Sequence, residues 1–301
     1  MTAWPSVGVV LPTRNRPEQL RAALAAVLAQ DYPGELRAII VHDRSEPDQS
    51  LVGAAVQVVR NSRTPGLAGA RNTGVLALAT GLVAFCDDDD QWLPGKLRSQ
   101  VEALAARPEA EFASCGIIVE YAGHSSPRLA GRDEVTHQDL LRSRMAMVHS
   151  STFVARRAAL IHDIGLIDEA IPGSHNEDWD LVLRVTRRHP IVYVDRPLAR
   201  IAWGDGSHFS RQWETKAEAL KWMLDHHPDI AGCRAGAAMV YGQLAFAYAC
   251  LGRRSDAWRW MGKALRSNWH ERRVPFALAV AAGLVPGETV LRKLHARGHG
   301  I

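Results

Sequence analysis

The chain has 301 residues, of which 47% are hydrophobic and 23% charged, and its formal net charge is +4. The apolar content and the nine Trp residues exclude a mainly disordered protein, and the length favours one large domain with an appendage. The mildly basic charge suits anionic small molecules, a membrane surface or nucleic acid, and selects none of them.

The four cysteines lie far apart in the sequence, at Cys86, Cys115, Cys233 and Cys250, and form no C-x-x-C pair. We therefore expect neither a zinc site nor a disulfide framework. The first residues carry no basic segment followed by a long apolar one, and no run approaches the ~18 apolar residues of a membrane span. These patterns predict a cytoplasmic protein.

Short apolar runs alternate with helical patterns at the start of the chain. Strands are predicted at residues 6–11, 37–42, 55–60 and 81–86. One helix is predicted to begin at Pro17, with an apolar stripe at helical spacing, and another to cover residues 69–80. Strands that alternate with helices at this spacing predict a parallel α/β sheet.

Polar segments follow three of these strands: PTRNRP at 12–17, DRS at 43–45 and four aspartates at 87–90. Because ligands of such sheets bind beyond the carboxyl ends of the strands, we expect the three segments to line one crevice. A divalent cation shared with a phosphate would offset the repulsion among four adjacent carboxylates. A solvated acidic turn is the alternative that these residues leave open.

The middle third of the chain is less regular. Strands are predicted at residues 112–121, 147–156 and 190–195. A helix is predicted over 176–188, with acidic residues in its first turn, Arg in its last, and Asn176 or His175 as its cap. Residues 204–210 are expected to form a loop.

From about Glu214 onward the strand patterns stop. Residues 237–269 resemble a tetratricopeptide-like helical hairpin with a break at Gly252, and residues 275–301 add a short apolar helix and a basic amphipathic one. We therefore divide the chain into an α/β domain, 1–212, and a C-terminal helical region, 213–301. This region is expected to pack on the first domain, to mediate homo-oligomer contact, or to dock on a membrane surface.

Four segments occur in a defined order: VVLPTRNRP, IIVHDRS, GLAGARNTGVLALATGLVAFCDDDDQWLPGKL and NEDWDLVLRV. Their order and spacing resemble those of glycosyltransferase family 2, over about residues 6–210. The resemblance implies the GT-A fold, a Rossmann-like mixed sheet flanked by helices, here followed by an all-helical appendage. It also implies a nucleotide-sugar donor, a divalent cation (Mn²⁺ or Mg²⁺) and inverting sugar transfer.

The resemblance assigns roles to the first two strand ends. Pro12, Thr13 and Arg14 would border the base and ribose of the donor, and Asp43 would contact the base. The commonest family form has an acid and a glycine after the position of Asp43, where this chain has Arg and Ser. The donor base therefore stays open among UDP-, dTDP- and GDP-sugars.

Further nucleotide-sugar contacts follow from the resemblance at Arg63, Arg71 and Asn72, which match the region that approaches the base and diphosphate. Cationic side chains at the start of a helix suit phosphate in any case.

The acidic cluster matches the D-x-D segment of the family. Asp87 and Asp88 would contact the donor, with Asp88 towards the ribose, and Asp89 would bind the metal. Asp90 would brace the loop. The resemblance also suggests His208 as a metal ligand, although a lone loop histidine is often simply solvated.

The catalytic residues implied by the resemblance lie in NEDWD. Inversion needs a base that deprotonates the acceptor hydroxyl, and Asp178 matches that position, with Glu177 as an acceptor or donor contact. A charged helix start is the plain alternative for both. Asp180 and Arg184 are expected to make surface or loop contacts.

Two other functions compete with the glycosyltransferase. A sugar-nucleotide nucleotidyltransferase of similar fold would need a glycine-rich triphosphate loop, which PTRNRP lacks. A catalytically inactive binding subunit is the other alternative. For the leading function we expect a glycan, glycolipid or secondary-metabolite acceptor, no nucleic acid, and a cytoplasmic location with a peripheral site at the inner face of the membrane as an option.

Overall fold

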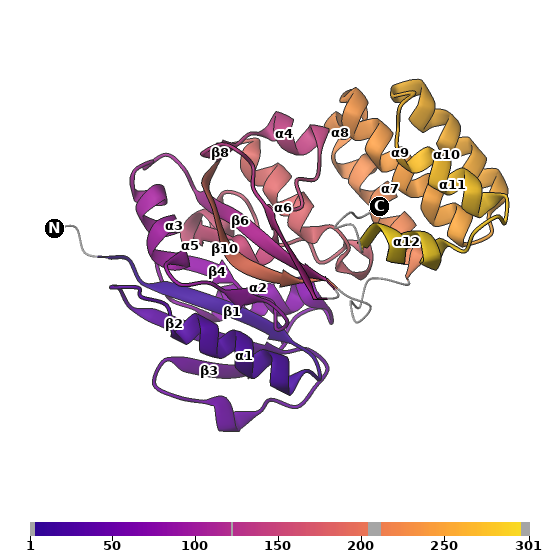
Figure 1. Ribbon diagram of the computed structural model, residues 1–301. Coiled ribbons are helices and arrows are strands. Elements are labelled where there is room, and N and C mark those ends of the chain that lie inside the picture. Colours follow the sequence, from indigo (N-terminus) through magenta and orange to yellow (C-terminus); the bar gives the residue numbers. More distant parts are fainter. Residues whose placement is uncertain (1–3, 122, 204–211, 296–301) are drawn as a thin grey trace.

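The computed structural model describes residues 4–121, 123–203 and 212–295 (Figure 1). A mixed α/β part built on one large sheet comes first, and an all-helical part follows it. Within these ranges, no helix combines the length and the hydropathy that crossing a membrane requires.

Ten strands form one sheet, in the order β3-β2-β1-β4-β9-β6-β10-β5, with β7 paired to β6 and β8 to β10. They are β1 (Val7–Thr13), β2 (Leu36–His42), β3 (Val56–Arg60), β4 (Leu82–Phe85), β5 (Gln91–Trp92), β6 (Phe112–Tyr121), β7 (His124–Arg128), β8 (Glu134–Val135), β9 (Val154–Arg156) and β10 (Ile191–Ala202). β1 is parallel to β2 and β4, whereas β9 runs antiparallel between β4 and β6. The sheet is therefore mixed, and the carboxyl ends of β1, β2 and β4 meet at one edge.

Helices cover both faces of this sheet. The helical segments of the α/β part are α1 (Pro17–Leu28), η1 (Gln49–Leu51), α2 (Leu67–Ala77), α3 (Lys96–Ala105), α4 (His137–Arg142), η2 (Ser150–Thr152), α5 (Arg157–His162), η3 (Pro172–Ser174) and α6 (Glu177–Thr186). Because strand side chains alternate, Val9 and Leu11 of β1 join the cluster under α1 and α3, and Val10 joins the one under α2 and α6. The sheet is thus buried on both faces.

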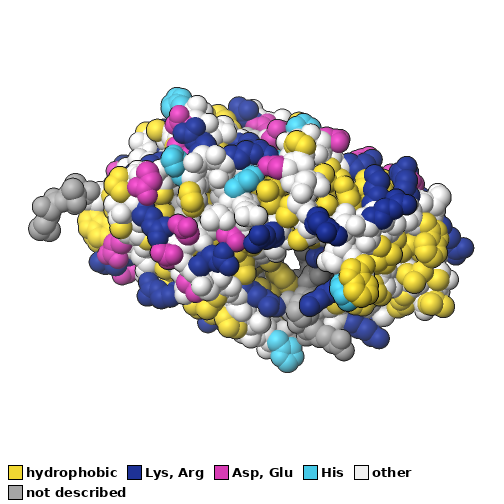
Figure 2. All heavy atoms as spheres, turned by 90° about the horizontal axis from the view of Figure 1, so that it is seen from above, with side chains coloured by type: hydrophobic (Ala, Val, Ile, Leu, Met, Phe, Trp, Pro, Cys, Tyr) yellow, Lys and Arg dark blue, Asp and Glu magenta, His cyan; other side chains and the backbone are white. Residues whose placement is uncertain are grey.

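The second part consists of helices packed around α9. These helices are α7 (Trp213–His226), α8 (Pro228–Gly232), α9 (Arg234–Cys250), α10 (Arg254–Ser267), α11 (Arg273–Ala281) and α12 (Gly287–His295). The predicted break at Gly252 lies between α9 and α10, where Gly252 has φ +72°, a conformation that favours glycine. Seen from above, the molecule has a hollow bordered by Lys and Arg side chains (Figure 2).

The two parts share buried surface. One hydrophobic cluster contains Val10 and Phe85 of the sheet together with Leu244 and Phe246 of α9. At the same junction, His227 Nε2 lies 2.8 Å from Asp180 Oδ1 of α6, and both side chains are buried. The division into residues 1–212 and 213–301 stays a prediction.

Most of the predicted elements are present. The first four strand predictions are confirmed to within two residues by β1 to β4, and α1 begins at the expected Pro17. The predicted helix at 176–188 is α6. Asn176 occupies its cap position, at φ +68°, but its side chain makes no capping hydrogen bond to the described residues.

The strand predicted at 147–156 is wrong over most of its length, because only its last residues form β9. The segment before β9 is η2. There the His149 side chain accepts a hydrogen bond from the Ser151 N–H, and Thr152 Oγ1 donates to the His149 carbonyl at 2.6 Å. Side-chain bonds of this kind compete with strand pairing, and hydrophobic alternation does not reveal them.

The strand predicted at 190–195 is longer than expected and continues to Ala202 as β10. Pro197 lies inside this strand, although proline cannot donate a hydrogen bond to the ladder. The pairing of β10 with β6 instead shifts register on either side of Pro197, so a bulge absorbs it.

Candidate active site

A cleft of about 520 Å³ lies at the edge where the parallel strands end, and we call it the strand-end cleft. Its lining includes Pro12, Thr13 and Arg14 after β1, Asp43 and Arg44 after β2, and Asp87, Asp88 and Asp89 after β4. The prediction that these three segments line one crevice is confirmed. Residues 169–174 line the cleft as well.

Two of the aspartates differ in their surroundings. Thr13 Oγ1 donates to Asp88 Oδ2 at 2.7 Å, and Arg16 Nη1 lies 3.2 Å from Asp88 and 2.7 Å from Asp89. Burial raises the pKa of both carboxyls above the usual range. The Asp89 side chain keeps 36% of its surface exposed, against 8% for Asp88, so Asp89 is the more open of the two.

Arg16 was not singled out in the sequence, where only Arg14 of the same loop was. Asn15 has φ +56°, in the left-handed region, between the two arginines. Both arginines line the strand-end cleft, and Arg16 also contacts the aspartates. The available signal was electrostatic, since a loop with two arginines faces a loop with four carboxylates across the sheet edge.

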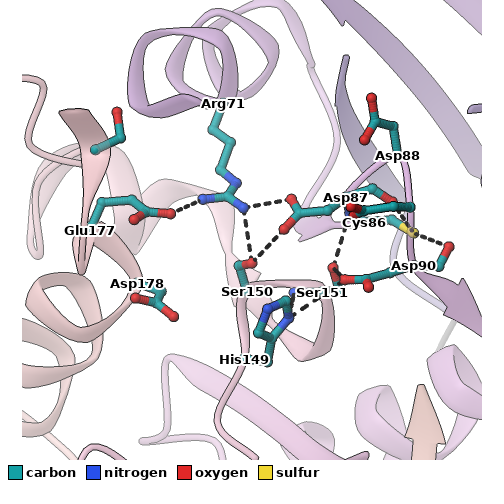
Figure 3. Close-up of polar contacts among 12 residues, drawn as sticks. Arg71, Cys86, Asp87, Asp88, Asp90, His149, Ser150, Ser151, Glu177 and Asp178 are labelled. Atoms are coloured by element: carbon teal, nitrogen blue, oxygen red, sulfur yellow. Dashed lines mark hydrogen bonds and ion pairs between the residues drawn. The ribbon is translucent and has the colours of Figure 1, made fainter. Parts of the chain in front are cut away.

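Arg71 joins the acidic cluster to the start of α6 (Figure 3). Its Nη2 donates to Asp87 Oδ1 at 2.5 Å and to Ser150 Oγ at 2.9 Å, and its Nη1 donates to Glu177 Oε1. The residue is 1% exposed. Burial alone would lower the pKa of Arg71, but the charges of Asp87 and Glu177 raise it, so the guanidinium stays charged.

Residues of η2 hold the other side of the acidic loop. Ser151 Oγ donates to Asp90 Oδ2 at 2.5 Å and accepts from the Asp87 N–H at 3.0 Å. Asp90 Oδ1 accepts from the Ala202 N–H at 3.3 Å, and burial raises the pKa of Asp90 well above its usual range. Asp90 therefore ties the loop to both η2 and β10.

His149 completes this group. Its Nδ1 lies 3.6 Å from Asp90 Oδ2, and Asp87, Asp90 and His149 each place one potential ligand atom within 4.8 Å of the others. Burial lowers the pKa of His149, although the charge of Asp87 opposes this shift. Sequence reasoning missed His149 and its two serine neighbours, because the run HSS was interpreted as part of a strand.

Asp178 and Glu177 lie in the first turn of α6, and both are buried. Arg144 Nη2 lies 2.9 Å from both carboxylate oxygens of Asp178. Burial would raise the pKa of Asp178, but Arg144 and then His149 outweigh it and lower the pKa. Burial raises the pKa of Glu177, even though Arg71 favours its charged form. Arg144 was also missed by the sequence reasoning, since no motif marks its loop.

Several predicted site residues lie outside the lining of the strand-end cleft, and others have partners that fix them in it. Within the described residues, Arg63, Arg71, Asn72, Glu177 and Asp178 do not line it. Arg63 pairs with Glu169, and Asn72 Nδ2 donates to the Ile167 carbonyl at 2.8 Å and to Glu169 at 2.7 Å. Asp43 Oδ1 accepts from Asn61 Nδ2 at 2.8 Å and from the Gly66 N–H at 3.0 Å. His208 lies outside the described residues, and the assigned roles stay predictions.

The donor set suits a hard divalent cation. Mg²⁺ and Mn²⁺ prefer oxygen ligands, and Mg²⁺ commonly uses one or two carboxylates together with phosphate. Asp89 offers such a carboxylate, because it lines the strand-end cleft and its side chain is partly exposed. The residues present therefore fit a cation that is shared with a phosphate ligand.

Comparisons with known proteins agree with this arrangement. A family model described as Glycosyl transferase family 2 matches residues 8–163. An uncharacterized glycosyltransferase of Mycobacterium tuberculosis is 36% identical over 171 residues, which span 55% of this chain and 74% of that protein. The pre-mycofactocin glycosyltransferase of the same species is 33% identical over 208 residues, or 62% of this chain and 42% of that protein.

Solved structures give the same architecture. Staphylococcus aureus TarS 1–349 in complex with UDP-GlcNAc matches with a TM-score of 0.63 at 14% identity, over 98% of this chain and 92% of that one. The mannosyltransferase PcManGT from Pyrobaculum calidifontis, in complex with GDP-Man and Mn²⁺, matches with a TM-score of 0.57 at 17% identity, over 93% and 87%.

The fold is thus that of the GT-A glycosyltransferases. The chain belongs to glycosyl transferase family 2. This membership makes the protein an enzyme of the glycosyltransferase class, and the nucleotidyltransferase alternative gives way to it.

Proposed function

We propose that this protein is an inverting, metal-dependent glycosyltransferase that moves a sugar from a nucleoside-diphosphate sugar to an acceptor hydroxyl. The observation that carries the proposal is the Arg71 bridge. Through it, the acidic loop at the strand-end cleft and the carboxylates at the start of α6 form one connected group. A donor-binding segment and a catalytic segment are thereby held in fixed relation.

The donor nucleotide lies in the strand-end cleft in this proposal. Pro12, Thr13 and Arg14 border the base and ribose, Asp43 contacts the base, and Asp88 is directed to the ribose. Asp43 and Asp88 are already fixed by hydrogen bonds from Asn61 and Thr13, so little side-chain entropy is lost when a donor binds. The neighbours TarS and PcManGT were solved with UDP-GlcNAc and GDP-Man, which supports a nucleotide sugar here.

Asp89 holds the divalent cation, Mn²⁺ or Mg²⁺, in this proposal. The cation supplies charge neutralisation for the departing diphosphate. Arg16 contacts Asp89 and Asp88 and lines the same cleft, so its guanidinium adds positive charge close to the donor phosphates. Three further predicted residues do not line the cleft within the described part of the chain: Arg63, Arg71 and Asn72. In this proposal they orient the carboxylates of Glu169, Asp87 and Glu177.

Asp178 is the proposed general base. A base on the face opposite the leaving diphosphate draws the proton from the acceptor hydroxyl as the new glycosidic bond forms, which inverts the anomeric configuration. Glu177, fixed by Arg71, is proposed to contact the acceptor or the transferred sugar. The acceptor is a glycan, glycolipid or secondary metabolite.

The helical region, 213–301, is proposed as an appendage that packs on the catalytic domain. Docking on the inner face of a membrane and contact with a second copy remain the further roles proposed for it.

A panel of nucleoside diphosphates tests the proposed donor. Thermal denaturation is followed with UDP, dTDP or GDP, each with Mn²⁺ and with EDTA. We expect one nucleotide to raise the melting temperature only when Mn²⁺ is present. Equal shifts in EDTA would contradict the metal dependence, and the absence of any shift with all three would contradict the donor class.

A further inference from the structure

The exposed apolar side chains of this protein are concentrated in the helical region. Among the described residues, nine large hydrophobic side chains are strongly exposed, and five of them lie within residues 258–284: Trp258, Leu265, Trp269, Leu278 and Leu284. Figure 2 shows hydrophobic side chains gathered at the helical end of the molecule, next to Lys and Arg side chains. Exposed apolar side chains that cluster mark interaction sites, whereas scattered ones need no explanation.

Two of these side chains belong to one strip along α10, which we call the α10 strip: Trp258, Gly262 and Leu265. The spacing i, i+4, i+7 places these residues on one face of the helix. Trp258 is 56% exposed and Leu265 is 42% exposed. A Cβ added at Gly262, between them, would meet no described atom within 4 Å, so the middle of the strip is open.

The α10 strip is separate from the face that anchors α10 in the fold. The buried residues of this helix belong to the same hydrophobic cluster as Leu244 and Phe246 of α9, and they are Ala257, Trp260, Met261 and Ala264. The helix therefore already has its core contacts. A tryptophan on a second, exposed face of the same helix points to a partner outside the described part of the chain.

A basic strip runs beside the α10 strip. Arg259, Lys263 and Arg266 repeat the same spacing one residue further along, which turns them by about 100° around the helix. All three are exposed, and Arg259 stays 62% exposed although it lies 3.1 Å from Asp256. Residues 254–295 hold eight Lys and Arg against three Asp and Glu, an excess of +5, where the whole chain has +4. The positive charge of the protein is thus concentrated in α10 to α12.

We propose that the α10 strip docks on an anionic membrane surface, with Arg259, Lys263 and Arg266 against the lipid headgroups. This inference rests on the docking role proposed for residues 213–301, and it names the face and the lipid chemistry. Tryptophan is favoured at the boundary between headgroups and acyl chains. Anionic headgroups attract Lys and Arg that lie beside that boundary.

The charge beside the α10 strip argues against a second copy as its partner. A two-fold contact brings the same surface of both chains together. Residues 254–295 of both copies, each with an excess of positive charge, would then be neighbours, and like charges oppose such a contact. An acidic protein would attract the arginines, but lysine is depleted in protein interfaces, whereas Trp and Leu beside Lys and Arg are typical of membrane-surface helices.

Sedimentation of the full chain with vesicles tests the docking face. Vesicles of phosphatidylcholine and phosphatidylglycerol in equal parts are compared with vesicles of phosphatidylcholine alone. We expect binding to the anionic vesicles that added salt weakens. Leu265→Gln and Arg259→Gln should each weaken this binding by about fivefold or more. The matched controls are Leu28→Gln on α1, with the same exposure as Leu265, and Arg37→Gln on β2, and both should bind as wild type does.

Tryptophan fluorescence in vesicles with brominated acyl chains reports whether the strip reaches the lipid. Bromine quenches a tryptophan that lies at the acyl boundary. Trp258→Phe keeps an apolar side chain, so it should still bind the vesicles while it loses part of the quenching. Equal quenching of this variant and wild type, or wild-type affinity in both Leu265→Gln and Arg259→Gln, overturns the α10 strip as the docking face.

The remaining outcomes separate this inference from the proposed function. No binding to anionic vesicles at low salt overturns the lipid partner, and self-association that Leu265→Gln abolishes would then identify a second copy as the occupant. The nucleotide panel is measured without vesicles. A nucleotide shift without vesicle binding therefore overturns the docking alone, and vesicle binding without any nucleotide shift contradicts the donor class alone.

Discussion

The Lys96 ammonium lies over the ring of Trp92, with Nζ 3.9 Å from the ring centre. Lys96 is fully buried, and its Nζ has no hydrogen-bond partner among the described residues. Burial lowers the pKa of Lys96 from 10.5 to about 8, although the nearby thiols of Cys115 and Cys86 oppose this shift. Burial therefore destabilises the charged form of Lys96, which lies near Cys86, the residue before the acidic loop.

Replacing this lysine should stabilise the protein at neutral pH. A pKa of about 8 instead of 10.5 corresponds to about 3 kcal/mol, and the aromatic contact offsets about 0.5–2 kcal/mol of this. We expect Lys96→Met to raise the free energy of unfolding by about 1–3 kcal/mol at pH 7. Urea denaturation measures this difference.

The direction of the pKa shift of Lys96 determines how stability changes with pH. The folded pKa is below the unfolded one, so between pH 8 and 10.5 the unfolded state binds more protons and the stability due to this group rises with pH. The advantage of Lys96→Met should therefore shrink over that range. Lys263→Met is the control, since Lys263 is exposed and lies 4.3 Å from the centre of the Trp260 ring. A pH-independent difference for Lys96→Met would contradict the assignment.

Loss of the Arg71 bridge should be strongly destabilising. Arg71→Met leaves the carboxylates of Asp87 and Glu177 without their shared cation, and breaking a buried pair in this way costs about 3–5 kcal/mol. Arg63→Met removes an ion pair whose arginine is 40% exposed, and should cost less than about 1 kcal/mol. Equal midpoints for the two variants in urea would show that the bridge is not a structural requirement.

The metal assignment predicts a specific loss of binding. Asp89→Ala should weaken Mn²⁺ binding by about tenfold or more in the presence of the nucleoside diphosphate, because the cation loses its open carboxylate. Titration of Mn²⁺ by electron paramagnetic resonance measures this directly. Asp163→Ala, with a half-exposed carboxylate, should leave the affinity unchanged. Wild-type Mn²⁺ affinity in Asp89→Ala would move the metal site elsewhere, for example to Asp87, Asp90 and His149.

Asp178→Asn should separate chemistry from binding. The asparagine keeps the shape of the side chain but cannot take the proton, so kcat should fall by roughly 10²–10⁴-fold. Nucleotide affinity should stay within a few-fold of wild type, because Asp178 does not line the strand-end cleft within the described residues. Rates and nucleotide binding are measured on the same preparations, and a near wild-type rate would mean that another carboxylate is the base.

Asp180→Asn is a control with a defined side effect. Asp180 is 2% exposed and accepts from His227 Nε2 at 2.8 Å and from Arg184 at 2.8 Å. Of the surface or loop contacts that the sequence suggested, it makes a loop contact, and it is a buried structural residue. Because Asp180→Asn leaves the Arg184 guanidinium without its carboxylate, the variant should lose about 3 kcal/mol of stability, but it should retain most of its kcat when assayed well below its melting temperature. Inactivity of the folded variant would implicate Asp180 in catalysis.

How much of the structure could be predicted from the sequence depended on how far apart in the chain the interacting residues lie. Hydrophobic periodicity is local, and it predicted β1 to β4 and α6, while ordered motifs predicted that Thr13, Asp43 and Asp88 would meet in one cleft. Arg144 and His149 had no such signal. Their importance arises from packing of the α4–η2 loop against α6 and the acidic loop, which residues distant in sequence decide.

The same limit applies to Arg71. A motif placed it in the donor region, near the start of a helix. In the structure Arg71 is buried between two carboxylates, one of them 106 residues away. Charge pairing over such separations follows from the finished fold and not from spacing in the sequence.

The tie between Asp90 and the Ala202 N–H joins residues 112 positions apart, and this separation has a consequence for protein synthesis. A ribosome delivers the acidic loop long before β10, and domains fold as units while the chain emerges. A stalled nascent chain that ends before β10 therefore carries the aspartates but cannot hold their loop in its final form. Affinity for the nucleotide should appear late, at the point where β10 has left the ribosome.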